Sequence, residues 1–513
     1  MKKFTRIITF VLALLMICAM AVACADNKTD DPKETTTPKS DNPGQNTGDE
    51  TTAPTDTSSE YQPDNLPEDL NYGNKEVMVL HWNAERDEFV SEGISGDNIL
   101  DAIWNRNITI EERLGVKLAF EECKGNNANL SVFVQKVNTS FAAGEKIYDI
   151  IATYSRTAAQ LAIKGYYADL NGIDDSYIDK DMPWWPDSII ETMGVGDALY
   201  YISGDASTNT LHFMYTIYYN KQLLTDRGLT DPTEYVDNHT WTIEKLIEMS
   251  SNQYQDLDND AKLSAGDFYG FSTIYYGVDA FYTGSNLKLV ERTNDDELIK
   301  ISDDYFSQKA VDLVDKLKPW LTSNDCYVSR KSAKVDYALP FVDGNVLFCQ
   351  NRVYLADAKH GSGLNAVLWQ YGLGPTPLYD ENQENYITVI GNPFTLYGVM
   401  VDCEEKTMMT AVLECWGSEA YRLTTPALFE TNMKYKYSGL DTSARMFDIL
   451  RETSSFDQGR IYSNTLGPYM SEIISSTACD GGSWATVSKI YKKMLPKQLD
   501  AIIKSFQSIQ SQK

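Results

Sequence analysis

The stretch from residue 76 to residue 165 constrains the fold most, because short apolar runs alternate there with segments of helical periodicity. The predicted strands are residues 76–82, 116–120 and 148–153. The segments between them repeat apolar residues at the spacing of an amphipathic helix. Strands that alternate with helices predict βαβ units around a largely parallel sheet, and hence an α/β fold. In such sheets, ligands bind beyond the carboxyl ends of the strands.

Charge and composition exclude several classes of function. Of the 513 residues, 45 are Lys or Arg and 73 are Asp or Glu, which gives a net charge of −28. Nucleic acids and anionic membrane surfaces both select basic protein faces, so we expect no nucleic-acid partner and no electrostatic adsorption to a membrane. The chain has 32 Tyr and 9 Trp but only 4 His, which favours stacking and hydrogen bonding over histidine or metal chemistry.

Residues 1–23 are typical of an export signal peptide, because a basic start precedes an apolar stretch that is too short to span a bilayer. The run that ends at Ala23-Cys24 resembles a bacterial lipobox, in which the cysteine is acylated, as with palmitate, and becomes the mature N-terminus. Ala21 departs from that pattern, which usually has Leu. An ordinary signal peptide that is cut nearby is the alternative. Acylated Cys24 would anchor the protein to the extracellular face of the cell membrane.

Residues 24–73 are predicted to follow as a lipidated cysteine and a disordered tether. From Asp26 to Asn65 the chain has no Val, Ile, Leu, Met, Phe or Trp. Such a stretch cannot bury enough apolar surface to offset the entropy of ordering it. We therefore expect it to hold a folded domain clear of the membrane.

The folded part contains six cysteines, and no two of them have C-x-x-C spacing. A zinc knuckle or a thioredoxin motif is therefore not expected. The six could form up to three disulfides or could be small buried apolar residues, and we expect them to be mostly free and buried. They are Cys123, Cys326, Cys349, Cys403, Cys415 and Cys479.

Several motifs follow one another in a fixed order within residues 75–510. They are LAIKGYYADL at 161–170, YYNK at 218–221 with GLTDP at 228–232 and TW at 240–241, FVDGNVLF at 341–348, and PTPLYDENQENY at 375–386. In these motifs the chain resembles the extracellular solute-binding proteins of ABC importers, family 1, which includes maltose-binding-like sugar receptors. The last motif resembles a lipoprotein subgroup of Gram-positive bacteria, although Leu378 stands where that subgroup usually has Lys.

The resemblance implies a periplasmic-binding-protein-like fold, in which two α/β lobes are joined by a multi-strand hinge and a ligand cleft lies between them. The implied first lobe comprises residues 74–205 and 350–420. The implied second lobe comprises residues 206–349 and 421–513. The chain would then cross between the lobes near residues 203–212, 348–352 and 417–425.

The resemblance also implies a function. A tethered two-lobed receptor would capture a small solute, most simply a carbohydrate, and deliver it to the membrane subunits of an ABC permease. Capture needs no cofactor and no enzyme activity, and we expect a monomer. Two alternatives remain open, namely a surface sensor or adhesin that does not transport, and a secreted glycosidase. A peptide or polyol ligand also remains open.

Candidate ligand contacts come from the predicted strand ends, the implied hinge and the aromatic residues. Sugars suit such sites, because their C–H faces pack on aromatic rings while their hydroxyl groups bond to polar side chains. Ordinary packing in the core is the alternative for each single aromatic residue. The predicted contacts are Trp82, Asn83, Tyr154, Ser155, Trp185, Asp205, Ser207, Tyr276, Tyr282, Asn351 and Arg352.

One acidic loop has the spacing of a calcium-binding loop. Asp256, Asp258, Asp260, Lys262 and Asp267 occupy positions 1, 3, 5, 7 and 12 of an EF-hand-type loop. Alternate carboxylates in such a loop converge on one hard cation, and position 7 offers a backbone oxygen. The loop lacks the glycine and the bidentate glutamate of the usual pattern. We predict a structural Ca²⁺ here, with a solvated acidic loop as the alternative.

Overall fold

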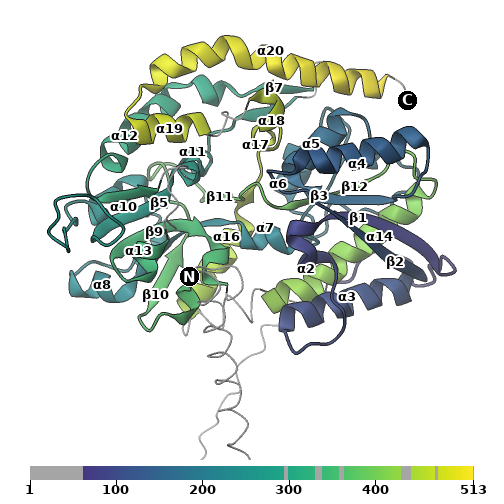
Figure 1. Ribbon diagram of the computed structural model, residues 1–513, viewed down its shortest axis with the longest axis horizontal. Coiled ribbons are helices and arrows are strands. Elements are labelled where there is room, and N and C mark those ends of the chain that lie inside the picture. Colours follow the sequence, from purple (N-terminus) through teal and green to yellow (C-terminus); the bar gives the residue numbers. More distant parts are fainter. Residues whose placement is uncertain are drawn as a thin grey trace, which may run out of the picture. The chain divides into compact units, whose positions relative to one another are not determined.

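The computed structural model describes residues 62–293, 298–329, 338–357, 363–428, 441–467 and 472–511 (Figure 1). The predicted signal peptide, the lipidation site Cys24 and the tether up to residue 61 lie outside these ranges. Among the described helices, none combines the length and the apolar character that a bilayer crossing requires.

Lobe 1 is built on a four-stranded sheet with helices on both of its faces. Its elements are β1 (Lys75–Trp82), α3 (Asn98–Leu114), β2 (Val116–Cys123), α4 (Leu130–Ala143), β3 (Ile150–Tyr154), α5 (Ser155–Ile163), β12 (Thr395–Val399) and α14 (Lys406–Glu419). The strand order is β12–β3–β1–β2, with β1 parallel to β2 and β3, and β12 antiparallel to β3. The predicted βαβ alternation is therefore confirmed.

Local signals fix the ends of α3. The Asp97 carboxylate accepts hydrogen bonds from the backbone N–H groups of Ile99 and Leu100, which satisfies two donors of the first turn. At the other end, Gly115 adopts a left-handed conformation with a φ of 59°. The end of β1 that precedes α3 is held in the sheet by its pairing with β2, up to Trp82 opposite Cys123.

Lobe 2 is built on a five-stranded mixed sheet. Its elements are β4 (Tyr215–Asn220), α8 (Lys221–Asp226), α9 (Pro232–Asp237), α10 (Ile243–Ser250), β5 (Tyr269–Ile274), α11 (Asp279–Gly284), α12 (Gln308–Leu321), β8 (Cys326–Ser329), α13 (Leu339–Val342), β9 (Val346–Arg352) and β10 (Tyr371–Gly374). The strand order is β10–β4–β9–β5–β8, in which β9 is parallel to β5 and antiparallel to β4. The ends of β5 and β9 therefore lie at the same edge of this sheet.

The remaining elements connect the lobes and cover their surfaces. They are η1 (Asn83–Glu85), α2 (Arg86–Phe89), η2 (Leu170–Gly172), α6 (Asp187–Met193), α7 (Thr208–His212), η3 (Tyr275–Gly277), β6 (Val290–Arg292), β7 (Ile299–Ile301), η4 (Asp303–Phe306), η5 (Val353–Ala356), η6 (Leu364–Ala366), β11 (Thr388–Val389), η7 (Ala420–Thr424), α16 (Asp441–Glu452), β13 (Ser454–Ser455), α17 (Gln458–Ile461), α18 (Ser463–Leu466), α19 (Glu472–Asp480) and α20 (Trp484–Gln510).

Between its described elements, the chain changes from one sheet to the other at three points. The first passage starts at Ile202, which pairs with Tyr397 of β12, and runs through α7 into β4. The second runs from β11 into β12. The third lies between η7, which packs on α3, and α16, which packs on β10. The first passage agrees with the predicted crossing at 203–212.

The second passage lies later in the chain than the sequence predicts. β9 extends to Arg352 within the sheet of lobe 2, and β10 then adds an antiparallel edge strand to β4. The predicted boundary at residue 350 is therefore corrected to one near residue 390. A polar segment after a buried strand can be either a loop within one lobe or a crossing between lobes. The sequence alone did not distinguish these two possibilities.

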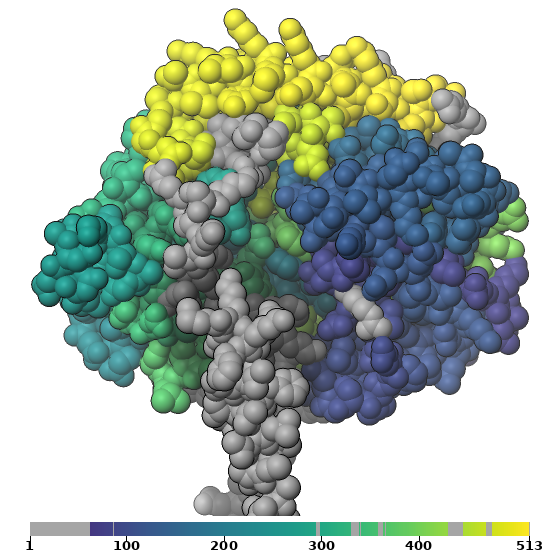
Figure 2. Space-filling model, in the orientation of Figure 1, coloured from purple at the N-terminus to yellow at the C-terminus, as the bar shows by residue number. Residues whose placement is uncertain are grey.

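The C-terminal residues, which were assigned to lobe 2, contact both lobes. α17 packs on α5 of lobe 1 as well as on β6, and α20 contacts β7 and α12 at one end and α5 at the other. Figures 1 and 2 show α20, in yellow, lying over the teal and the blue parts of the molecule. Leu495, Leu499, Ile502 and Phe506, which recur at helical spacing on one face of α20, are buried.

Candidate functional site

The first and second passages between the lobes lie side by side at Met214 and Ile390. We call this pair the wall, because a cavity lies on one side of it and Arg352 on the other. Met214 and Ile390 pair in an antiparallel bridge. Both residues line a cavity of about 520 Å³. The neighbouring residues Tyr215 and Gly391 both lie against Arg352. Successive side chains of an extended chain point to opposite faces, so the cavity and Arg352 lie on opposite sides of the wall.

Arg352, at the end of β9, lies among three aromatic rings. Its guanidinium carbon is 5.0 Å from the ring centroid of Phe213, 5.1 Å from that of Tyr215 and 5.8 Å from that of Tyr276. Arg352 Nη2 also donates a hydrogen bond of 3.1 Å to the Tyr215 hydroxyl. We call these four residues the aromatic–arginine cluster. It brings together two predicted contacts, Tyr276 and Arg352, from the ends of β5 and β9.

Lobe 1 contributes two predicted aromatic residues at its own strand ends. The ring centroids of Trp82, which ends β1, and Tyr154, which ends β3, are 5.5 Å apart. Trp82 Nε1 donates a hydrogen bond of 2.9 Å to Thr395 Oγ1. The Ser155 hydroxyl donates to the backbone carbonyl of Asn392 at 2.6 Å, which ties the strand end to the second passage. Trp82 and Tyr154 are 1% and 3% exposed.

Electrostatic contacts connect Tyr154 with the aromatic–arginine cluster. Burial raises the pKa of the Tyr154 hydroxyl, while the positive charges of Arg156, Arg352 and Arg460 act to lower it. Arg352 belongs to lobe 2, whereas Arg156 lies in the first turn of α5 in lobe 1. Arg352 lies against Gly391, whose neighbour Asn392 accepts the hydrogen bond of Ser155, so the strand ends of both lobes approach each other beside Tyr154.

Arg460 is held by a buried ion pair. Its Nη1 lies 2.7 Å from Asp279 Oδ2 of α11, and both side chains are 7% exposed. α17, which carries Arg460, packs on α5. This contact could not be predicted from the sequence, because the two partners are far apart in the chain and neither stands at a predicted strand end.

Trp185 and Asp205, also predicted as ligand contacts, line the 520 Å³ cavity on the other side of the wall. Asp205 Oδ2 is 2.9 Å from Arg451 Nη2, and Trp185 Nε1 donates to Glu414 Oε2 at 2.8 Å. The structure therefore does not bring these two residues together with Trp82 and Tyr154.

Two further predicted contacts lie near the start of the first passage. Asn83 lines a smaller cavity of about 210 Å³, next to Thr208 and His212. Ser207 is buried, and its hydroxyl donates to Glu88 Oε2 at 3.1 Å. Asn83 and Ser207 therefore both lie close to α7, in the first passage between the lobes.

The remaining two predicted contacts, Tyr282 and Asn351, are buried inside lobe 2. Tyr282 is 1% exposed, and its hydroxyl donates to the backbone carbonyl of Lys288 at 2.9 Å. Asn351 is buried within β9, and its side-chain oxygen accepts from the backbone N–H of Arg352 at 2.7 Å. Phe213 and Tyr215 were missed, although their spacing of two residues at a predicted crossing was a usable signal.

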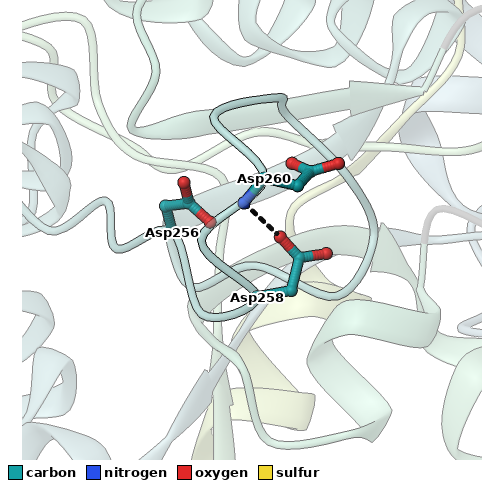
Figure 3. A group of neighbouring side chains, drawn as sticks. All are labelled: Asp256, Asp258 and Asp260. Atoms are coloured by element: carbon teal, nitrogen blue, oxygen red, sulfur yellow. Dashed lines mark hydrogen bonds between the residues drawn. The ribbon is translucent and has the colours of Figure 1, made fainter.

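The predicted calcium loop forms only part of the expected arrangement. Carboxylate oxygens of Asp256, Asp258 and Asp260 lie within 4.8 Å of one another, and Figure 3 shows the three side chains gathered in one loop. Asp267 faces elsewhere, because its carboxylate accepts from the backbone N–H groups of Leu257 at 3.2 Å and Ser264 at 2.9 Å.

Charges within the loop are partly balanced. Lys262 Nζ lies 3.5 Å from Asp260 Oδ2. The backbone N–H of Asp260 acts to lower the pKa of Asp258, but partial desolvation and repulsion from Asp260, Asp267 and Asp256 raise it overall. The three oxygen donors suit a hard cation such as Ca²⁺. They do not form the twelve-residue EF-hand arrangement that the sequence suggested.

No protein-family model and no curated protein matches the sequence. Solved structures do match it. The galacto-N-biose/lacto-N-biose I-binding protein of an ABC transporter from Bifidobacterium longum is 11% identical, with a TM-score of 0.53, over 84% of this chain and 98% of its own. A cyclo/maltodextrin-binding protein solved with maltotetraose is 13% identical, with a TM-score of 0.52, over 84% and 96%.

A third structure agrees with these two. An ABC substrate-binding protein from Listeria monocytogenes, solved with cycloalternan, is 15% identical, with a TM-score of 0.50, over 85% of this chain and 99% of its own. Identities this low show the fold alone. The chain therefore has the two-lobed α/β fold of the solute-binding proteins of ABC transporters.

Proposed function

We propose that this protein is the extracellular binding component of an ABC importer and that it captures a carbohydrate between its lobes. The observation that carries the proposal is the meeting of both lobes around Tyr154. Trp82 and Tyr154 come from the sheet of lobe 1, and Tyr276 and Arg352 come from that of lobe 2. Rings and hydrogen-bonding groups on facing lobes are the combination that carbohydrate recognition uses.

Capture would work by selective stabilisation of the closed state. A ligand that contacts both lobes binds more tightly when the lobes are together, so it shifts the population toward closure. The closed shape is then the signal that a permease reads. Binding and release change no covalent bond, and we propose that the protein is not an enzyme. The three proteins of similar fold described above are binding proteins, which supports this proposal.

The sequence also supports a proposal about the location of the protein. We propose that Cys24 is acylated and that residues 24–73 tether the lobes outside the cell membrane. The lipobox-like run supports the anchor, and the lack of large aliphatic residues from Asp26 to Asn65 supports the tether.

The ring of Tyr276 offers a direct test of the binding site. We expect Tyr276→Ala to weaken binding of a carbohydrate found by a thermal-shift screen about 10-fold, because the variant removes a stacking surface and loosens Arg352. Titration calorimetry measures the change. Tyr327→Ala is the matched control, since this partly buried tyrosine on β8 packs on Tyr269, away from the cluster. Equal losses in both variants, or none in Tyr276→Ala, would count against the site.

We also propose that Asp256, Asp258 and Asp260 hold a structural Ca²⁺. Three exposed or half-exposed carboxylates would bind it weakly, with a dissociation constant on the order of 10⁻⁴ to 10⁻³ M. We expect about 5 mM calcium to raise the melting temperature of the full chain, and Asp258→Asn to remove that effect. A titration without heat, together with an unchanged melting temperature, would refute the proposal.

A further inference from the structure

The charge at the meeting point of the lobes is opposite to the charge of the chain. The whole sequence carries a net charge of −28. Around Tyr154, however, three arginines gather, namely Arg156, Arg352 and Arg460, of which Arg460 is ion-paired with Asp279. A concentration of guanidinium groups in a strongly acidic protein calls for a specific explanation, because neutral sugars do not require it.

Backbone contacts place the three arginines at the amino end of α5. Arg156 is the second residue of this helix, and α17 packs on the helix and brings Arg460 to it. Arg352 reaches the same place from lobe 2. A Cβ added to Gly391 would lie 2.6 Å from Arg352 Nε, and the next residue, Asn392, accepts the hydrogen bond of Ser155.

The helix end itself adds positive character. α5 spans nine residues, and its N-cap residue Tyr154 makes no side-chain capping hydrogen bond. The N-terminus of a helix carries a partial positive charge and exposes backbone donors, which together favour an anion. This field adds to that of the arginines and does not define the site alone.

Two of the guanidinium groups keep hydrogen-bond donors that nothing in the described part of the chain satisfies. Nε of Arg156 and Nε of Arg460 are buried and have no acceptor. The Arg460 residue is only 5% exposed. A buried donor without a partner costs stability, so such donors at the junction of two lobes point to an acceptor that arrives with the ligand.

We propose that the carbohydrate captured here is acidic, and that Arg156, Arg352 and Arg460 recognise a carboxylate of a uronic acid residue. The inference rests on the proposed function and specifies its substrate class. A guanidinium group matches a carboxylate geometrically, because its planar fork can donate two parallel hydrogen bonds. Tyr276 and the other rings of the aromatic–arginine cluster would then contact the apolar faces of the sugar.

Matched pairs of ligands test the charge preference. The full chain is titrated by calorimetry with oligogalacturonides and the corresponding galacto-oligosaccharides, and with oligoglucuronates and the corresponding gluco-oligosaccharides. We expect an acidic member to bind at least about 10-fold more tightly than its neutral counterpart, the effect of charge-assisted hydrogen bonds. A neutral member that binds as tightly as its acidic counterpart would overturn the inference and leave the proposed function standing. If neither kind binds, the proposed function fails, and the inference with it.

Single variants assign the preference to this cluster. We expect Arg156→Gln to reduce the ratio of acidic to neutral affinity about 10-fold. The melting temperature should change little, because the hydrogen bond from Arg156 Nη1 to Asn127 Oδ1, at 3.0 Å, is exposed. Arg445→Gln is the control, since Arg445 forms an exposed ion pair with Asp237 on lobe 2. A folded Arg156→Gln variant and a folded Arg352→Gln variant that both keep the full preference would overturn the assignment.

Discussion

Glu414 shows how one buried carboxyl group connects stability to pH. Burial raises its pKa to about 7, although hydrogen bonds from Trp185 Nε1 and from the backbone N–H of Asp179 act to lower it. The folded state therefore holds this proton more tightly than the unfolded state does. Stability from this group is complete below about pH 4.5 and is lost as the pH rises toward 7, by about 3 kcal/mol at most.

The corresponding prediction concerns the slope of stability with pH. We expect the free energy of unfolding of the parent protein to decrease between about pH 5 and pH 8. The free energy of unfolding of Glu414→Gln should decrease less steeply, because the amide does not titrate. Urea unfolding at both pH values measures the slopes. Glu404→Gln should keep the slope of the parent protein, since Glu404 is exposed and Lys146 lowers its pKa. Identical slopes for the parent and Glu414→Gln would contradict the argument.

Gly391 determines where the guanidinium of Arg352 can lie. A methyl group at this position would come within 2.6 Å of Arg352 Nε and 2.8 Å of its Cζ. The side chain can move aside, so we expect Gly391→Ala to fold normally but to bind its carbohydrate on the order of 10-fold more weakly. Titration calorimetry checks this, with Gly374→Ala as the control, because no atom lies within 4 Å of a Cβ there. Unchanged affinity would mean that the position of Arg352 does not matter.

Residues at predicted strand ends could be found from the sequence, whereas residues brought in by tertiary contacts could not. Trp82 and Tyr154 follow apolar runs whose periodicity fixes the end of each strand, and they do meet. Arg460 joins them only because α17 packs on α5, some three hundred residues away in sequence. Trp185 and Asp205 were predicted as ligand contacts, and they line the cavity on the other side of the wall, because the side that they face depends on geometry that the sequence does not contain.

The C-terminal helix α20 connects the two lobes through aromatic contacts. Near its start, Trp484 packs on Tyr305 of lobe 2, with ring centroids 4.9 Å apart. Near its end, Phe506 stacks on Tyr200 of lobe 1, at 5.2 Å. Its amphipathic face was predictable from residue spacing, but its two partners were not. An apolar stripe indicates that a helix is covered, without naming the surface that covers it.

Removing the Phe506 ring should therefore weaken the fold at lobe 1. Phe506 is fully buried, so we expect Phe506→Ala to lower the free energy of unfolding by about 3 to 5 kcal/mol. Ile490→Ala on the same helix is the control, because Ile490 is 64% exposed and should change stability by less than about 0.5 kcal/mol. Urea unfolding measures both, and equal effects would show that α20 does not pack as described.

At the scale of the whole molecule, the α/β class followed from alternating strands and helices, and the two lobes followed from a resemblance. The point at which the chain returns to lobe 1 did not follow from either of these. β10 pairs with β4, which lies about one hundred and fifty residues earlier in the chain, and such a pairing leaves no local mark in the sequence. The return therefore occurs near residue 390, so that Met214 and Ile390 pair beside the cavity of about 520 Å³, on the side away from Arg352.

Native mass spectrometry tests the central claim most directly. The purified full chain is mixed with defined neutral and acidic oligosaccharides and sprayed under non-denaturing conditions. The account predicts a noncovalent complex of one protein with one oligosaccharide, which is released on activation with its mass unchanged. Failure to retain any oligosaccharide, or the appearance of shortened products in the mixture, would contradict the claim that this protein binds a carbohydrate without altering it.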